Sequence, residues 1–155
     1  MSIFRNVLIS LMVALALWTP SPARATDGPL FLFGGSNRDQ FLGCLNCYRS
    51  ETFSVWNEKS EYGSPEHPDS IWNREGAFGS RSSPFSPWNP SATKPPLVVD
   101  RVGNLYGYLT LNASHRQRVR RNDSHPKWAD FELLVWLLDN YDWVITHLDE
   151  VRAQY

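Results

Sequence analysis

Apolar and polar positions are arranged in patterns that differ from one segment of this chain to the next. The first pattern is an apolar run over residues 7–18, broken only by Ser10 and followed by prolines and by the small residues of Ala-Arg-Ala at 23–25. A positive residue precedes the run, which is shorter than the roughly 20 residues that span a bilayer. This three-part layout predicts a cleavable signal peptide over residues 1–25 and a single mature domain over 26–155.

Two segments of the mature chain have the pattern of β-strands. Residues 29–33 form a short apolar run that ends at a Gly-Gly turn, which predicts a first strand. Residues 97–111 predict a hairpin, because a short apolar strand and a return strand over 105–111 flank a polar turn. Leucines alternate with Tyr106 and Tyr108 in the return strand. We therefore expect the leucines to face the core and the tyrosines to line the opposite face.

The C-terminal segment has the period of a helix. Over residues 127–153, apolar side chains recur at alternating spacings of three and four, and further apolar residues widen that face. The preceding residues, 112–126, are polar and basic and show no apolar period, so we expect a loop there. The pattern predicts one long C-terminal helix that packs against the core.

The strongest internal pattern is a tandem repeat with a period of 16 residues over positions 54–96. Ser-x-Trp-Asn occurs three times and an aromatic-Gly-Ser triplet twice, at 54–57, 70–73, 86–89, 62–64 and 78–80. A fixed period indicates that each copy is one small unit that packs on its neighbours. We expect Gly63 and Gly79 to adopt backbone conformations that other residues avoid. The predicted fold class is α+β: a small, mostly β and irregular domain with aromatic repeats and a hairpin, plus the long helix.

The repeats lie between two further motifs. Residues 41–47 read Phe-Leu-Gly-Cys-Leu-Asn-Cys, and residues 99–110 read Val-Asp-x-x-Gly-Asn-Leu-Tyr-Gly-Tyr-Leu-Thr. With the repeats, these motifs resemble a family of short, exported bacterial proteins over about residues 37–112 of this chain. The resemblance implies a bacterial source and a shared small domain, and it carries no activity. The chain departs from a regular repeat at Ser60, which stands where the second copy has Gly76, and the third copy lacks its Gly-Ser half.

Charge narrows the possible partners. Removal of residues 1–25 leaves 13 basic and 16 acidic residues, and a net charge near −3 does not favour nucleic acid as a partner. Basic residues concentrate in one loop, in a patch of Arg116, Arg118, Arg120 and Arg121. Such a patch could contact nucleic acid, an anionic lipid or a polyanionic surface polymer, but runs of charge are more often simply solvated.

The chain has two cysteines, Cys44 and Cys47. In the oxidising compartment that a signal peptide implies, they predict a small structural disulfide. A redox-active pair would need a helix start after a strand within a βαβ pattern, which this sequence lacks. Half of a zinc site would need a second close Cys or His pair, which is also missing, so we expect no metal and no cofactor.

Candidate binding residues are the aromatic side chains of the repeats and the hairpin: Trp56, Trp72, Trp88, Tyr106 and Tyr108. A row of flat rings could stack on the apolar faces of sugars. A repeat that needs a core also repeats its anchors, which explains the tryptophans more simply.

Asp39, Asp69 and Asp100 lie in or near predicted turns. Two of them could form the acidic pair of a hydrolase, but turn capping is the default role of such residues. The sequence has no Gly-x-Ser-x-Gly elbow, no phosphate loop and no His-x-x-x-His motif, so nothing in it argues for catalysis.

These observations favour an exported, non-enzymatic binding or interaction protein of the cell envelope, located in the periplasm or outside the cell. Its partner would be an envelope glycan or another envelope protein. A small hydrolase of wall polymer is the second hypothesis, and a thiol-disulfide protein is the third.

Overall fold

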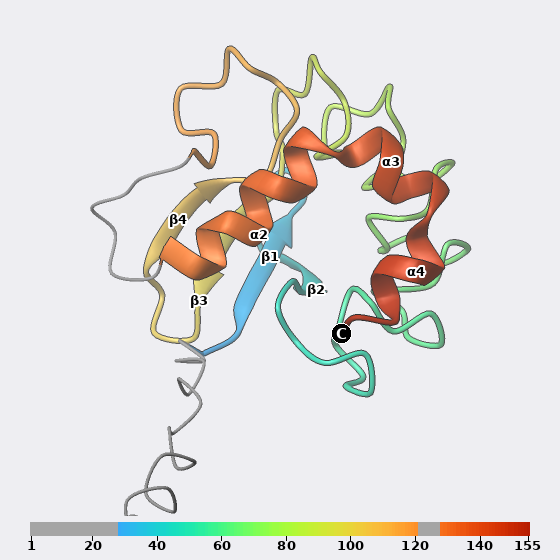
Figure 1. Ribbon diagram of the computed structural model, residues 1–155. Coiled ribbons are helices and arrows are strands. Elements are labelled where there is room, and N and C mark those ends of the chain that lie inside the picture. The colour runs from blue at the N-terminus through green and yellow to red at the C-terminus, as the bar shows by residue number, and fades with distance from the viewer. Residues whose placement is uncertain (1–27, 121–127) are drawn as a thin grey trace, which may run out of the picture.

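The computed structural model describes residues 28–120 and 128–155 (Figure 1). The expected signal peptide and Arg121 of the basic patch lie outside the described residues. The described residues form four strands and three short helices, which is an α+β architecture as predicted. None of these helices is long and apolar enough to cross a membrane.

The four strands form one antiparallel sheet. They are β1 (Leu30–Gly34), β2 (Gln40–Cys44), β3 (Leu97–Asp100) and β4 (Leu105–Tyr108), arranged in the order β2-β1-β3-β4. The first strand and the hairpin lie where the sequence patterns predict them. Leu30 and Leu32 are buried on one face of β1, whereas the alternating Phe31 and Phe33 are half-buried on the other.

The predicted faces of the hairpin are wrong for Leu105 and for both tyrosines, although Leu109 is buried as predicted. Leu105 is 51% exposed, whereas Tyr106 and Tyr108 are buried. The positions still alternate over β4, but the strand turns its tyrosines rather than Leu105 to the core. A bulge lies at this point, because Val98 pairs with Gly107 and Val99 with Leu105.

The single long C-terminal helix is also a wrong prediction. The segment forms α2 (Trp128–Asp139), α3 (Tyr141–Thr146) and α4 (Leu148–Arg152). The helix breaks at Asn140 and at His147, whose φ angles are −118° and −122°. A continuous helix over the predicted residues would be a rod about 40 Å long. The breaks let the chain bend around the repeat region instead (Figure 1).

The repeat region connects β2 to β3 as a series of tight turns that lies beside α3 and α4 (Figure 1). Backbone N–H groups here bond mostly to carbonyls three or four residues earlier, as in Ser60 to Asn57 and Gly76 to Asn73, both at 3.0 Å. Contacts such as the ion pair between Arg81 and Asp142, at 2.5 Å, join the turns to α3.

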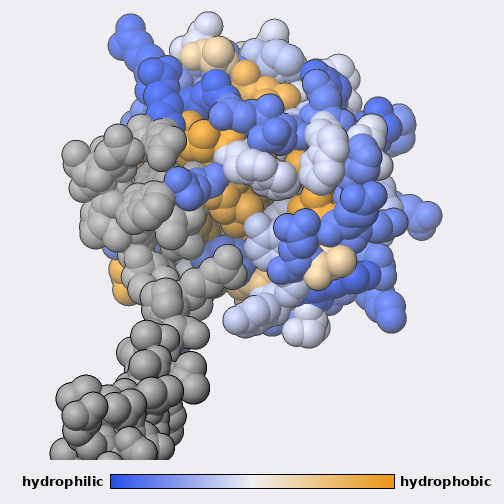
Figure 2. Space-filling model, in the orientation of Figure 1, coloured by the Kyte–Doolittle hydropathy of each residue, from blue (hydrophilic) through white to orange (hydrophobic). Residues whose placement is uncertain are grey.

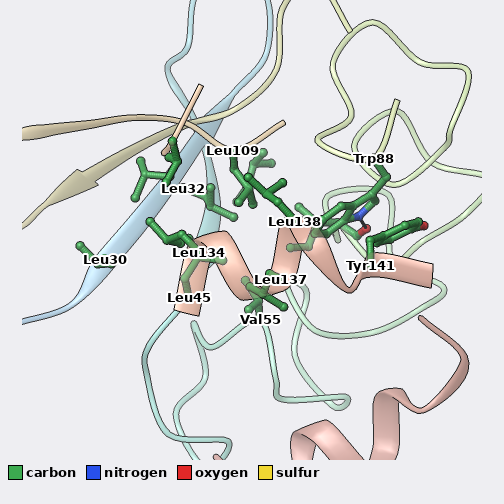
Figure 3. Packing of buried hydrophobic residues seen from close by; sticks show 14 of the residues in the cluster. Leu30, Leu32, Leu45, Val55, Trp88, Leu109, Leu134, Leu137, Leu138 and Tyr141 are labelled. Atoms are coloured by element: carbon green, nitrogen blue, oxygen red, sulfur yellow. Dashed lines mark hydrogen bonds between the residues drawn. The ribbon is translucent and has the colours of Figure 1, made fainter. Parts of the chain in front are cut away.

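The core lies between the sheet, the repeat region and α2. Leu134, Leu137 and Leu138 of α2 pack with Leu32 of β1 and with Leu109 just after β4 (Figure 3). Their spacing of three and four residues places the α2 leucines on one side of the helix.

Candidate functional site

A column of five aromatic rings runs through the repeat region. Trp56, Trp72 and Trp88 follow one another at centroid distances of 5.4 Å. Tyr155 stacks on the free face of Trp56 at 4.5 Å, and Tyr141 stacks on Trp88 at 4.4 Å. The C-terminal segment thus supplies the ring at each end of the column, and burial raises the pKa of the Tyr141 phenol.

Hydrogen bonds tie each indole to the layer before it. The Nε1–H groups of the three tryptophans donate to the carbonyls of Leu45, Val55 and Ile71 at 2.6, 2.6 and 2.5 Å. Within each copy, the hydroxyl oxygen of a buried serine accepts a hydrogen bond from the backbone N–H of the tryptophan two residues later. Every indole is therefore anchored by its face and by its nitrogen, as a buried tryptophan requires.

The hypothesis that these aromatic rings bind sugars is not retained. Trp56, Trp72 and Trp88 are at most 1% exposed, and each of these three indoles has an aromatic ring against both faces. Tyr106 is buried with its hydroxyl 3.4 Å from Asp100, and Tyr108 is buried beneath other side chains. The three tryptophans, Tyr106 and Tyr108 are therefore core anchors, because a ligand has no open ring face to contact.

Cys44 and Cys47 form a disulfide that closes the turn after β2. Both are buried, and Asn46 between them accepts a hydrogen bond from the backbone N–H of Leu30 at 2.7 Å. No helix begins at the pair, so the setting lacks the helix N-terminus that activates a redox thiol. The geometry suits a structural bond between the turn and the start of β1.

The three aspartates of the hydrolase hypothesis do not meet at one place. Asp100 is buried and accepts hydrogen bonds from two backbone N–H groups of the hairpin turn, at 3.0 and 2.9 Å. It pairs with Leu30, at one end of β1. Asp69 accepts a hydrogen bond from Gln40, which pairs at the other end of β1, about 13 Å away along the strand. This separation exceeds that of the carboxyl pairs of glycosidases, so Asp100 cannot form a pair with Asp69 or the nearby Asp39.

The arginines of the basic patch do not share one environment. Arg116 and Arg120 are exposed, whereas Arg118 is half-buried, with Nη2 3.9 Å from a carboxylate oxygen of Asp139. Among the residues that the structure describes, no group of three or more His, Cys, Asp or Glu side chains could hold a metal ion.

An exposed aromatic cluster that the sequence patterns did not single out lies on the C-terminal helices and is formed by Trp136, Trp143 and His147. The two indoles are 37% and 44% exposed and meet edge to face at 6.2 Å. The His147 ring stacks on Trp143 at 4.6 Å, and its Nδ1 lies 3.0 Å from the Trp143 carbonyl oxygen. The spacing of seven between the tryptophans was a partial signal, because it places two residues on one side of a continuous helix. The break at Asn140 lies between them, so their contact depends on how α3 follows α2.

The face that carries α2, α3 and α4 has apolar patches among hydrophilic side chains (Figure 2). Elsewhere, an open cleft beside Tyr155 is lined mainly by polar and charged residues, and two of them, Arg49 and Glu58, already form an ion pair at 2.9 Å. In comparisons with known proteins, no family model matches this chain, and no curated protein or solved structure is detectably similar to it. Any statement about function therefore rests on the side chains themselves.

Proposed function

We propose that this protein is an exported, non-enzymatic binding protein of the cell envelope, and that it contacts a glycan through Trp136 and Trp143. The observation that carries the proposal is the exposure of two large aromatic rings in contact with each other. Exposed indoles that are not needed for the core are a common feature of binding surfaces.

A rigid pair of rings suits a sugar because the C–H groups on the faces of a pyranose stack on flat aromatic surfaces. His147 fixes the Trp143 ring by stacking on it, so little side-chain entropy is lost on binding. Polar groups adjoin the rings in the sequence: Asp139 precedes the break before α3, and Asp142 precedes Trp143. Their carboxylates are exposed and could accept hydrogen bonds from sugar hydroxyls.

The location in the envelope is supported by the predicted signal peptide and by the disulfide. A buried disulfide persists where the surroundings are oxidising, as they are in the periplasm and outside the cell. Glycans are abundant there, which agrees with an aromatic binding surface.

The test is cosedimentation of the purified protein with insoluble peptidoglycan, which supplies the glycan. We expect Trp143→Ala and Trp136→Ala to weaken sedimentation at least tenfold, which corresponds to about 1.4 kcal/mol. The matched control is Tyr48→Ala, because Tyr48 is an exposed aromatic residue outside the cluster. Equal binding by both tryptophan variants and the control, or no binding by the unaltered protein, would contradict the proposal.

A further inference from the structure

A second group of side chains, which includes neither of the two exposed tryptophans, converges on Tyr108 at the end of β4. Arg38 comes from the turn between β1 and β2, and its guanidinium carbon lies 5.0 Å from the centroid of the Tyr108 ring. The His115 ring lies 4.6 Å from the same ring. Arg118 is brought alongside by its backbone, because Tyr108 pairs with it through hydrogen bonds of 2.8 and 2.9 Å to the flanking residues.

Arg38 is held in this place by an uncommon backbone conformation. Its φ angle is 58°, and it is the one non-glycine residue in the described part of the chain with a positive φ. This conformation is costly for a residue with a long side chain, so its surroundings must hold it there. The Tyr108 ring is part of those surroundings, since a guanidinium over an aromatic face is attracted to it.

The nitrogen atoms of this cluster have unused hydrogen-bonding capacity. Among the described residues, four buried side-chain nitrogens make no hydrogen bond, and three of them are Arg38 Nε, His115 Nδ1 and Arg118 Nε. The fourth belongs to Arg152, which instead lies beside Asp149 and Glu58 in a different part of the fold. A buried polar atom without a partner costs about 1–3 kcal/mol, so three together call for a common explanation.

The charge of these side chains indicates that their missing hydrogen-bond partner is an anion. Two arginines and a histidine are each placed beside Tyr108, and the exposed Arg116 and Arg120 belong to the same loop as His115 and Arg118. The carboxylate of Asp139, 3.9 Å from Arg118 Nη2, reaches one of these groups only loosely and is itself 62% exposed. Guanidinium groups bind phosphate oxygens through several N–H donors at once, and a phosphate offers acceptors to donors from different directions.

We propose that Arg38, His115 and Arg118 form a binding site for a phosphate group, with the Tyr108 ring as the platform that positions Arg38. The phosphate could belong to a small phosphate-bearing molecule or to the headgroup of an anionic lipid. The chemistry of recognition is the same for both sources.

The test uses the mature protein and titrates inorganic phosphate against it by calorimetry, with sodium chloride at matched ionic strength as the reference. We expect saturable binding of phosphate that Arg38→Gln weakens at least tenfold. Arg38→Lys keeps the charge but lacks Nε. We expect its affinity for phosphate to lie between that of the unaltered protein and that of Arg38→Gln. The charge-matched control is Arg101→Gln, because Arg101 is exposed in the hairpin turn at the other end of the sheet.

A circular dichroism spectrum and a melting temperature equal to those of the unaltered protein establish that each variant is folded. Absence of phosphate binding by the unaltered protein, or equal binding by Arg38→Gln and Arg101→Gln, would overturn the proposal. Vesicles then identify the source. Binding to phosphatidylglycerol vesicles but not to phosphatidylcholine vesicles, with loss in Arg38→Gln, supports the site with a lipid headgroup. Binding of inorganic phosphate without binding to either kind of vesicle supports the same site with a small phosphate-bearing molecule as its ligand.

Discussion

Two glycines of the repeats show how a single residue can be required for a reason other than its backbone angles. The expectation that Gly63 and Gly79 adopt unusual conformations is wrong, because neither has a positive φ. A Cβ atom at Gly63 would instead overlap the backbone carbonyl of Asn57, and one at Gly79 that of Asn73. The repeat brings two stretches of backbone into contact at these positions, which only a glycine allows.

We expect Gly79→Ala to lower the free energy of unfolding by about 3 kcal/mol, because backbone must move to admit the methyl group. Gly76→Ala is the matched control. A Cβ there would lie 3.1 Å from the Asn73 side chain and 3.2 Å from the Pro68 carbonyl, and the first copy has Ser60 at the equivalent position. Its cost should stay below about 1 kcal/mol in urea unfolding. Equal losses for both variants would contradict the backbone contact.

At the scale of elements, the aromatic column explains why the C-terminal segment is broken into three helices. Tyr141 begins α3 and covers Trp88, while Tyr155 follows α4 and covers Trp56. The two ends of the column are reached only if the chain bends between them. Local periodicity could not predict these bends, because the ring stacks that accompany them come from residues far away in the sequence.

Replacement of Trp72, the central tryptophan of the column, should show how much its ring and its indole nitrogen contribute to stability. In the unaltered protein the Trp72 indole N–H donates to the Val55 carbonyl at 2.6 Å. Trp72→Phe keeps an aromatic face but removes this donor. We expect a loss of about 3 kcal/mol in the free energy of unfolding, from the unpaired carbonyl and the smaller ring. Trp143→Phe serves as the control, because its ring is 44% exposed, and should change stability by less than about 0.5 kcal/mol. If the two variants unfold at the same urea concentration, the column is not a core element.

At the scale of the whole molecule, one chain combines a small sheet, a set of turns and a bent helical segment around a common core. The disulfide joins the end of β2 to the first turn after it, where the sheet meets the repeat region. Because the loop that it closes is very short, its effect on the unfolded chain is modest.

We expect the protein recovered from the periplasm of a bacterial host to begin at Thr26 and to be two hydrogens lighter than its reduced form. Cys44 and Cys47 are buried, so alkylation should require both reductant and denaturant. Cys44→Ala with Cys47→Ala should cost about 2 kcal/mol without loss of the fold. An intact mass that begins at Met1 would contradict the signal peptide, and thiols alkylated without denaturant would contradict the structural disulfide.

The sequence by itself determined the first strand, the positions of the hairpin strands, the helical character of the C-terminal segment and the role of the repeated tryptophans as anchors. Each of these depends on short-range patterns: apolar period, turn residues and the spacing of a repeat. The face that Tyr108 occupies, the breaks at Asn140 and His147, and the exposure of Trp143 were decided by the tertiary structure alone. The face that a strand turns to the core, a bend and an uncovered surface depend on how distant segments pack, which no local period records.

The candidate sites divide in the same way. The aromatic and basic residues are visible in the sequence, but their surroundings are not. Trp72 and Trp143 look alike in a sequence, and only packing makes one a core residue and the other a surface residue. Arg38 lies nearly 80 residues before His115 and Arg118. All three lie beside Tyr108, because the strand register places the ends of β1 and β4 at the same edge of the sheet. Such convergence is a property of the topology, since charge and reactivity act through space rather than along the chain.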